Sequence, residues 1–381
     1  CSPRSATTRR GTSLWSSPAR AAALYVTAGM VTAGVVASSL SWAGARSQVA
    51  TPAAPAANLV TPRGCAGCHA EVTREWQESL HAQSFRDPIF QAEFQPHPAE
   101  DCVACHAPLA TNLVAPAEAD AREGVGCVSC HMDAAGHILG SARGRQRSSA
   151  SAPAAAGQVD PPHPVQRSGE LGSAALCARC HEFAFPPPRA GSLGYDPAIL
   201  QQATFTEWRA SRAGRQGLAC VGCHMPRRAD GHFDHRMPGA SAELLARAVR
   251  VQVRATRDAD GVTVRVTLRT REVGHALPTG DIFRRLIVRA ELGSERTSTE
   301  LRRYFGTSHV GGALVTTEID DTRVMPGRPR VVTLRLPRVP GANRVRWSVA
   351  HARLDPSVAQ ARALPMSDVE TVFESGEALV R

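Results

Sequence analysis

Five stretches of the same form decide the class to which this chain belongs: Cys65-Ala-Gly-Cys68-His69, Cys102-Val-Ala-Cys105-His106, Cys127-Val-Ser-Cys130-His131, Cys177-Ala-Arg-Cys180-His181 and Cys220-Val-Gly-Cys223-His224. They contain all but one of the 11 cysteines in the 381 residues. Cys-x-x-Cys-His is the attachment signature of haem c, because two thiols three positions apart can each bond one vinyl group and the histidine then reaches the iron. The sequence therefore predicts five covalent haems c with these five histidines as proximal ligands.

Two other uses of cysteine compete with this interpretation. Tetrahedral zinc sites also contain Cys-x-x-Cys pairs, and an exported chain can form disulfides. Neither zinc nor a disulfide needs a histidine directly after every second cysteine, yet all five stretches have one. The pattern favours haem over both alternatives.

Residues 1–45 have the layout of a signal peptide. Four arginines precede an uncharged run, residues 21–40, and Ala43-Gly-Ala45 then matches an A-x-A cleavage site. The run is also long enough for a membrane anchor, but its content of Ala, Gly, Ser and Thr favours cleavage. We expect export to the periplasm or another extracytoplasmic compartment, with membrane association through this segment as the alternative. Residues 46–62, rich in Ala and Pro, are predicted to be a linker.

The rest of the chain divides into two predicted domains with different patterns. Residues 63–241 hold all five cysteine stretches and show no strand pattern, which predicts a mainly irregular and helical pentahaem cytochrome domain. Few large aliphatic residues occur there, as expected if the porphyrins themselves form much of the core. Residues 242–381 lack cysteine and alternate apolar with polar residues between turns, which is typical of an all-β, sandwich-like domain.

The same patterns place individual elements. Apolar residues recur at helical spacing in residues 69–81 and 197–212. Alternation predicts strands at residues 251–255, 262–268, 282–292, 329–336 and 343–350.

Nine further histidines could supply the second axial ligands: His81, His97, His137, His163, His232, His235, His275, His309 and His351. Histidine is expected to outnumber methionine in this role. Met132 and Met225 directly follow proximal histidines, so they cannot easily reach the opposite face of their own haem. His81 follows the first stretch by about three helical turns and is therefore expected to serve a neighbouring haem.

His137 and His97 are weaker candidates for axial ligands. His137 lies in a short loop six residues after His131, and His97 lies between two prolines that stiffen its loop. A surface position is the alternative for both. The remaining candidates are expected to have no role at iron, with His351 on a sheet face: His163, His309 and His351.

The stretch from Cys65 onward also resembles a known family. Trp76, Ser79, His81 and Ala82 follow the first haem signature as in the C-x-x-C-H … W-x-x-S-x-H-A opening of multihaem cytochromes of the cytochrome c-554/c-prime type. The resemblance extends to about Gly239 through these segments: Cys102-x-x-Cys105-His106-Ala-Pro108, Gly124-Val-Gly-Cys127, Glu207-Trp208, Cys220-x-x-Cys223-His224-Met-Pro226 and Asp234-His235-Arg236.

A second resemblance lies in the β-domain. Gly274-His275-Ala-Leu-Pro278-Thr279-Gly280, followed by Arg284-Arg285, is similar to a segment that recurs in multihaem cytochromes. The two resemblances imply distal iron ligation by His81, His235 and His275, with His232 as a near substitute for His235.

The leading functional prediction is a periplasmic cytochrome that relays electrons between redox partner proteins. Closely spaced, six-coordinate haems carry single electrons and leave no open site for a substrate. The alternative is a haem enzyme that reduces or oxidises a small nitrogen or sulfur compound at one five-coordinate haem. Pentahaem nitrite reductases commonly carry a C-x-x-C-K unit, and this chain has no lysine. A third class is an interaction module in which the β-domain docks a partner.

The formal net charge of +10 first suggests a nucleic-acid partner. Removal of residues 1–45 would discard four arginines and no acidic residue, which leaves +6. Each ferric haem adds about −1 by formal count, so the mature protein would carry a charge of about +1. Arginine pairs well with haem propionates. We therefore expect no nucleic-acid partner.

Overall fold

The computed structural model describes residues 62–141, 164–188 and 191–381. The predicted signal peptide, the predicted linker apart from its last residue, and His163 lie outside these residues. The described residues belong to one compact unit, Ser47–Arg381. Within that part of the chain, no helix has the length and apolar character needed to span a membrane.

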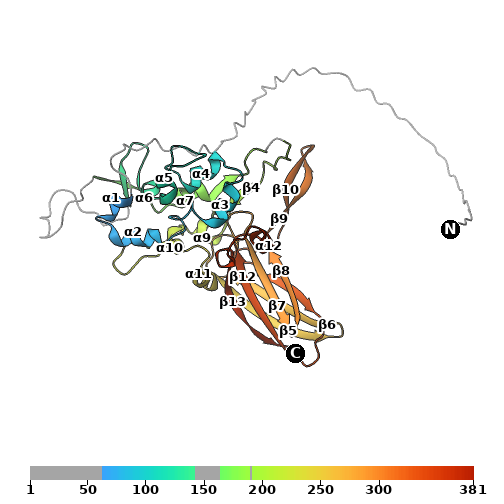
Figure 1. Ribbon diagram of the computed structural model, residues 1–381. Coiled ribbons are helices and arrows are strands. Elements are labelled where there is room, and N and C mark those ends of the chain that lie inside the picture. Colours follow the sequence, from blue (N-terminus) through green and yellow to red (C-terminus); the bar gives the residue numbers. More distant parts are fainter. Residues whose placement is uncertain (1–61, 142–163, 189–190) are drawn as a thin grey trace, which may run out of the picture. The chain divides into compact units, whose positions relative to one another are not determined.

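Short helices around the cysteine stretches dominate residues 62–248 (Figure 1). The helices are α1 (Pro62–Ala66), α2 (Ala70–Gln77), α3 (Pro88–Phe94), α4 (Glu100–His106), α5 (Glu118–Glu123), α6 (Cys127–His131), α7 (Ala174–His181), α8 (Thr204–Ala210), α9 (Arg212–Arg215), α10 (Val221–His224) and α11 (Ala242–Ala248). Two small sheets join them: β1 (Ile138–Ser141) with β2 (Val165–Ser168), and β3 (Glu182–Ala184) with β4 (Leu200–Ala203). We call residues 62–248 the helical part.

Local sequence explains several of these helices. Asp87 caps α3, where its carboxylate accepts from the backbone N–H groups of Ile89 and Phe90, and Pro88 occupies the first turn. The second, third and fourth cysteine stretches lie within α4, α6 and α7, so a helical turn brings both thiols of each stretch to one face. The helix predicted at residues 69–81 is shorter, and the one predicted at 197–212 is wrong in its first half. Residues 200–203 instead pair with residues 182–184 as a strand.

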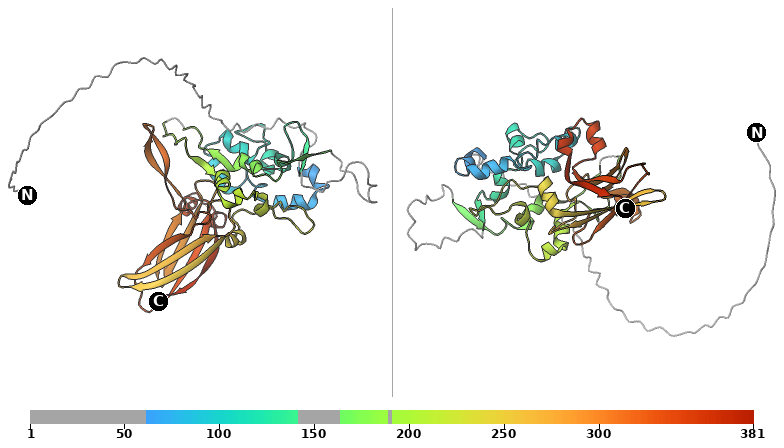
Figure 2. Two further views of the ribbon diagram at one scale, coloured as in Figure 1. Left: turned by 180° about the vertical axis from the view of Figure 1, so that it is seen from behind. Right: turned by 90° about the horizontal axis from the view of Figure 1, so that it is seen from below.

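Antiparallel strands dominate residues 249–381, which we call the β part (Figure 2). Its strands and short helices are β5 (Val249–Asp258), β6 (Gly261–Thr270), β7 (Arg285–Leu292), β8 (Glu295–Leu301), β9 (Arg303–Val310), β10 (Ala313–Asp321), β11 (Arg330–Leu336), β12 (Arg344–Ala352), α12 (Pro356–Ala361), α13 (Met366–Val369) and β13 (Glu370–Leu379). One sheet has the order β11-β6-β5 and another β13-β12-β7-β8, while β9 and β10 form a separate hairpin. Helices followed by antiparallel sheets confirm the coarse fold prediction.

A single apolar cluster joins the two larger sheets. The alternation in β6 buries Val264 and Leu268 on one face, and these side chains belong to the same cluster as Leu286 of β7 and Val345 of β12. All four are fully buried. The helical part has a smaller cluster, formed by Phe85, Phe94, Val103, Ala107 and Ala110.

Ion pairs and hydrogen bonds connect the helical part to the β part. Arg353 in the β part lies 2.8 Å from Asp87, and Arg323 lies 2.7 Å from Glu207. Arg303 donates to the backbone carbonyl of Leu200 at 2.9 Å. The two sets of elements are therefore tied together at several points, and the domain boundary predicted near residue 242 stays a prediction.

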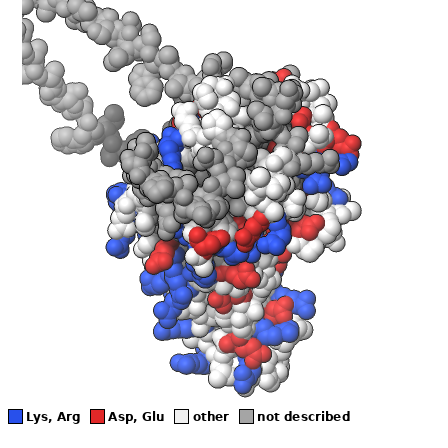
Figure 3. Space-filling view, turned by 90° about the vertical axis from the view of Figure 1, so that its left-hand side faces the viewer, with Lys and Arg blue, Asp and Glu red and all other residues white. Residues whose placement is uncertain are grey.

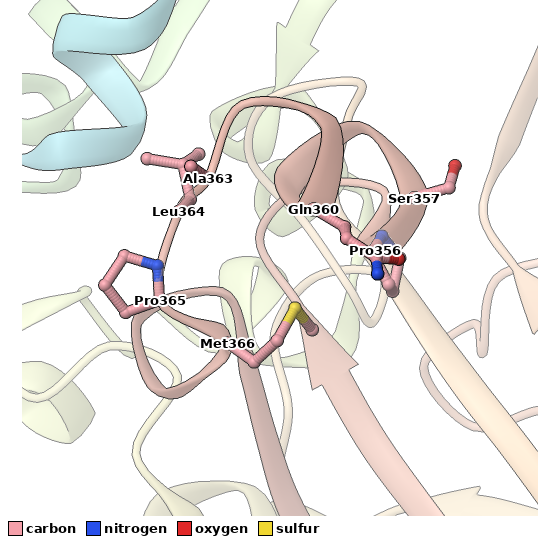
Figure 4. Close-up of a pocket in the computed structure, with 7 residues that line it drawn as sticks. All are labelled: Pro356, Ser357, Gln360, Ala363, Leu364, Pro365 and Met366. Carbon is pink, nitrogen blue, oxygen red and sulfur yellow. The ribbon is translucent and has the colours of Figure 1, made fainter.

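Charged side chains of both signs share the surface of the β part. On the face drawn in Figure 3, arginines and carboxylates are intermixed. Several exposed pairs match this pattern: Arg335 with Asp258, Arg344 with Glu377 and Arg346 with Glu291. A surface hollow of about 640 Å³ lies at α12 and α13, between Pro356 and Met366 (Figure 4). Its lining contains no cysteine or histidine.

Candidate haem centres

The cysteine stretches lie against one another within the helical part. All ten of their cysteines are free thiols. Three contacts between thiols join different stretches: Cys65 with Cys127, Cys105 with Cys180, and Cys177 with Cys220. Cys130 also lies near Cys180. The fourth stretch is thus the centre of the arrangement, because it meets the second, third and fifth.

Three proximal histidines face a second histidine from a distant part of the chain. The ring centroids of His181 and His81 are 6.1 Å apart. Those of His131 and His235 are 6.3 Å apart, and so are those of His224 and His275. The structure therefore brings His81, His235 and His275, the three residues singled out by resemblance, each beside the histidine of a different cysteine stretch.

These separations fit two imidazoles bound to opposite sides of one iron. A metal–imidazole nitrogen bond of about 2 Å, with the ring centroid roughly 1 Å beyond the nitrogen, places two such centroids about 6 Å apart. Around tetrahedral zinc the same bonds would bring the centroids to about 5 Å. The angle between the ring planes varies from 21° to 78°, and axial ligation permits this because each ring can rotate about its bond to the metal. The residues present fit haem iron.

Three of the predicted proximal histidines have Nδ1 hydrogen-bonded to a backbone carbonyl. The Nδ1–H groups of His106, His131 and His224 donate to the backbone carbonyls of Ser84, Leu139 and Pro238 at 2.8, 3.1 and 2.9 Å. A carbonyl can only accept, so Nδ1 carries the proton and Nε2 keeps its lone pair. Hydrogen bonding of this kind is usual for histidines that ligate metals, since it fixes the tautomer and the ring orientation.

The distal histidines show the same arrangement. The Nδ1–H of His235 donates to the carbonyl of Phe233 at 2.7 Å, and that of His275 to Ala276 at 2.9 Å. His81 places Nδ1 3.0 Å from the thioether sulfur of Met237. Met237 therefore contacts a predicted distal histidine, and sequence spacing could not indicate this contact.

Burial keeps several of these imidazoles neutral. It lowers the pKa values of His81, His235 and His275 below the ordinary range. Burial and then the neighbouring His81 lower the pKa of His181 to about 4. Neutral imidazole is the form that binds a metal, so these sites are ready for ligation at neutral pH.

The first and second stretches have different surroundings. His69 is exposed, and the ring of His106 stacks on Phe90 with centroids 3.9 Å apart. Among the described residues, neither has a second imidazole about 6 Å away. His97 and His137 are exposed, and His137 bonds Asp133 at 3.0 Å. Iron ligation by His97 or His137 stays a prediction.

The other histidines lie elsewhere. The His232 side chain contacts Asp230 and Glu75 at 2.7 and 3.2 Å, next to the loop of His235. His309 is exposed on β9, and His351 is buried on β12.

Arg284 differs from its neighbour Arg285. Arg285 is 3% exposed and pairs with Glu300 and Asp355 at 2.9 and 2.5 Å. Arg284 has no carboxylate at ion-pair distance in the described part of the chain. Burial and the nearby Arg353 lower the pKa of Arg284. Burial is also the main cause that lowers the pKa values of His106 and His181, and the charge of Arg284 adds to it at both, while Asp87 and Asp281 oppose it at His106. An unpaired guanidinium therefore lies near two proximal histidines.

Known proteins resemble this chain in sequence and in fold. Residues 64–132 match the family described as cytochrome c554 and c-prime. The chain is also similar in structure to a penta-heme cytochrome c552 from Thermochromatium tepidum, with a TM-score of 0.64 and 21% sequence identity. Together these findings support a multihaem c-type cytochrome family. The structural likeness covers 84% of this chain and 98% of that chain, so it extends well beyond residues 64–132 and shows a common fold. No curated protein matches the sequence.

Proposed function

We propose that this chain is an extracytoplasmic cytochrome c that holds five haems and transfers electrons between redox proteins. The observation that carries the proposal is the set of three histidine pairs with centroids 6.1–6.3 Å apart. Haem c supplies one-electron chemistry at its iron, with a potential set by axial ligand, burial and hydrogen bonds. Two histidines at one iron leave no position for a substrate, which favours electron transfer over catalysis.

Different residues would hold different parts of each haem. The ten cysteines would bind the porphyrins, and the histidines of the five stretches would be the proximal ligands. His81, His235 and His275 would be the second ligands of the haems held by His181, His131 and His224. Arg284 would pair with a haem propionate, since a guanidinium binds carboxylates well and none of the described carboxylates lies at ion-pair distance from it. The two sheets of the β part, which share one core, would form a sandwich that carries His275.

Partners and location follow from the same proposal. We propose redox proteins as electron donor and acceptor, with no nucleic-acid partner. Covalent haem attachment and the layout of residues 1–45 support export, with that segment as the point of membrane association if it is retained.

Two measurements test the proposal. A pyridine haemochrome assay should give five haems per chain, and a lower number in fully matured protein contradicts the count. Electron paramagnetic resonance of the oxidised protein should show low-spin haem for the three histidine pairs. His81→Ala, His235→Ala and His275→Ala should each convert one haem to high spin. Unchanged spectra in all three variants would refute these ligand assignments.

A haem enzyme is the second candidate, and His106 is the observation that favours it. No imidazole of the described residues lies about 6 Å from this proximal histidine, while the cation of Arg284 lies near it together with the carboxylates of Asp87 and Asp281. An open position there would accept a small nitrogen or sulfur oxyanion. Nitrite or hydroxylamine should then shift a high-spin signal of the oxidised protein, whereas a spectrum unaffected by either compound favours the electron carrier.

A further inference from the structure

Two Glu-Trp pairs in the helical part make the same set of contacts. Glu75-Trp76 lies at the end of α2 and Glu207-Trp208 lies in α8. Each pair is followed by a serine three residues after the tryptophan, Ser79 or Ser211, whose hydroxyl donates to that tryptophan's carbonyl at 2.6 or 2.7 Å. The sequence Glu-Trp-x-x-Ser thus folds in the same way twice.

The two tryptophans bind equivalent points of the chain. The indole N–H of Trp76 donates to the carbonyl of Val125 at 2.9 Å, and that of Trp208 to the carbonyl of Leu218 at 2.8 Å. Each acceptor lies two residues before the first cysteine of a Cys-x-x-Cys-His stretch, the third and the fifth respectively. Each indole therefore fixes the entry into a stretch that carries a proximal histidine.

The two glutamates bind the loops that carry the distal histidines. The carboxylate of Glu75 accepts from the backbone N–H of His235 at 3.0 Å. That of Glu207 accepts from the N–H of Ala276, directly after His275, at 3.1 Å, and from the hydroxyl of Thr279 at 2.8 Å. These loops belong to the same two histidine pairs whose proximal sides the tryptophans hold.

Both carboxylates also have cations beside them. Glu75 is 3% exposed and lies 3.3 Å from Arg228, and Glu207 lies 2.7 Å from Arg323. Hydrogen bonds from backbone N–H groups to a carboxylate that is paired with a cation are stronger than neutral ones. Each glutamate is therefore well suited to hold a loop in one position.

We propose that each Glu-Trp pair is a clamp that positions the two axial ligands of one haem. Glu75-Trp76 serves the His131–His235 pair, and Glu207-Trp208 serves the His224–His275 pair. Adjacent residues hold opposite sides of the same centre, because the tryptophan fixes the proximal stretch while the glutamate fixes the distal loop. The proposal rests on the proposed function, in which these histidines bind iron. Glu75 and Glu207 are then positioning residues.

The direct test compares Glu75→Ala with Glu78→Ala in the full-length, haem-loaded protein. Glu78 is exposed one turn away and serves as the matched control. Loss of a charge-assisted hydrogen bond should raise the high-spin fraction of one haem by roughly tenfold or more, measured by electron paramagnetic resonance. Added imidazole should restore low spin by occupying the position that His235 leaves. Glu75→Gln keeps an acceptor oxygen without the charge, so it should raise the high-spin fraction less. It replaces Glu75→Ala in this test if Glu75→Ala does not fold.

The second clamp has its own comparison. Glu207→Ala should loosen the His224–His275 centre in the same way, and Glu243→Ala, at an exposed position of α11, should leave the spectrum unchanged. Glu207→Gln is the milder variant here. A spectrum of Glu207→Ala identical to that of Glu243→Ala overturns the proposal for this pair.

Combined variants separate failure of the clamp from failure of the proposed function. Glu75→Ala should add nothing to the high-spin signal of His235→Ala but should add to that of His275→Ala, because the clamp acts through His235. If His235→Ala gives a high-spin haem and Glu75→Ala does not, the clamp is refuted while the ligand assignment stands. If His235→Ala itself changes nothing, the assignment of His235 as a ligand is refuted and the clamp with it.

Discussion

The helical part and the β part bury apolar surface by different means. In the β part, one cluster joins side chains from both larger sheets, and strands such as β6 are buried along a complete face. In the helical part, the cluster of Phe85 to Ala110 has only five buried residues, and most cysteines of the stretches are half-buried. The comparison teaches that the β part has a core made of its own side chains, whereas the helical part buries few apolar side chains around its paired histidines. The porphyrins of the proposed haems would supply the apolar surface that the side chains lack.

Removal of the fourth haem site should have the largest effect, and only on the helical part. The thiols of this stretch contact Cys105 and Cys220. Cys177→Ser combined with Cys180→Ser should therefore loosen its neighbours as well and make residues 62–248 sensitive to protease. Limited proteolysis with mass spectrometry should recover a resistant fragment from the β part.

The control for this experiment is removal of the first site, Cys65→Ser with Cys68→Ser. That stretch contacts only Cys127 among the thiol pairs described above and ends at the exposed His69. Cleavage should be confined near residue 65. Equal digestion of the helical and β parts in the first experiment would show that their cores do not differ in the way proposed.

A cavity in the core of the β part should have the next largest effect. Leu268→Ala removes a fully buried side chain and should lower the free energy of unfolding by about 2–5 kcal/mol. Chemical denaturation followed by tryptophan fluorescence measures the change, and the haem spectrum should stay as in the wild type before unfolding. Leu379→Ala, at a side chain that is 57% exposed, should change stability far less. A haem spectrum altered by Leu268→Ala would break the comparison, because the two cores would then depend on each other.

Patterning predicted the β part well where one strand face is buried, and less well elsewhere. The strands predicted at residues 262–268 and 329–336 are β6 and β11, whose buried residues alternate. The pattern missed β9 and β10, because many residues of this hairpin are half-buried or exposed on both faces. It also missed β13, where Glu374 and Glu377 break the apolar alternation.

For the candidate haem centres, the sequence predicted the candidate residues but not how they pair. Spacing alone indicated the cysteines and proximal histidines, and resemblance suggested the distal ones. Which distal histidine faces which stretch depends on contacts between residues far apart in sequence, such as His81 and His181, and spacing does not contain this information. The roles of Met237 and Glu75 were missed for the same reason, since each is defined by a partner about 160 residues away.

The pH dependence of stability should reveal the buried His351 of the β part. Burial, then Arg284 and Arg353, lower its pKa from 6.5 to about 3. Between these pH values the unfolded chain binds a proton that the folded chain does not. The contribution of neutral His351 to the free energy of unfolding is therefore fully present above pH 6.5. It is lost as the pH falls toward 3, by at most about 1.4 kcal/mol per pH unit. His351→Phe should flatten the profile, as measured by denaturation at pH 4, 5, 6 and 7. A profile of unchanged slope would show that His351 titrates alike in both states.

The smallest effect is expected where a residue of the β part acts on the haems. Arg284→Gln removes a positive charge near His106 and His181. Removal of this charge should stabilise ferric over ferrous iron and so lower the reduction potential. A tenfold change in the one-electron equilibrium corresponds to about 59 mV, and we expect a shift of this order for one haem in a spectroelectrochemical titration. Arg284→Lys should shift the reduction potential much less, because lysine keeps the positive charge. Arg254→Gln, at an exposed position on β5, is the matched control and should shift no haem measurably, because solvent screens its charge. Equal potentials in Arg284→Gln and Arg254→Gln would mean that the β part supports the haems through His275 and its loop, without a charge of its own near them.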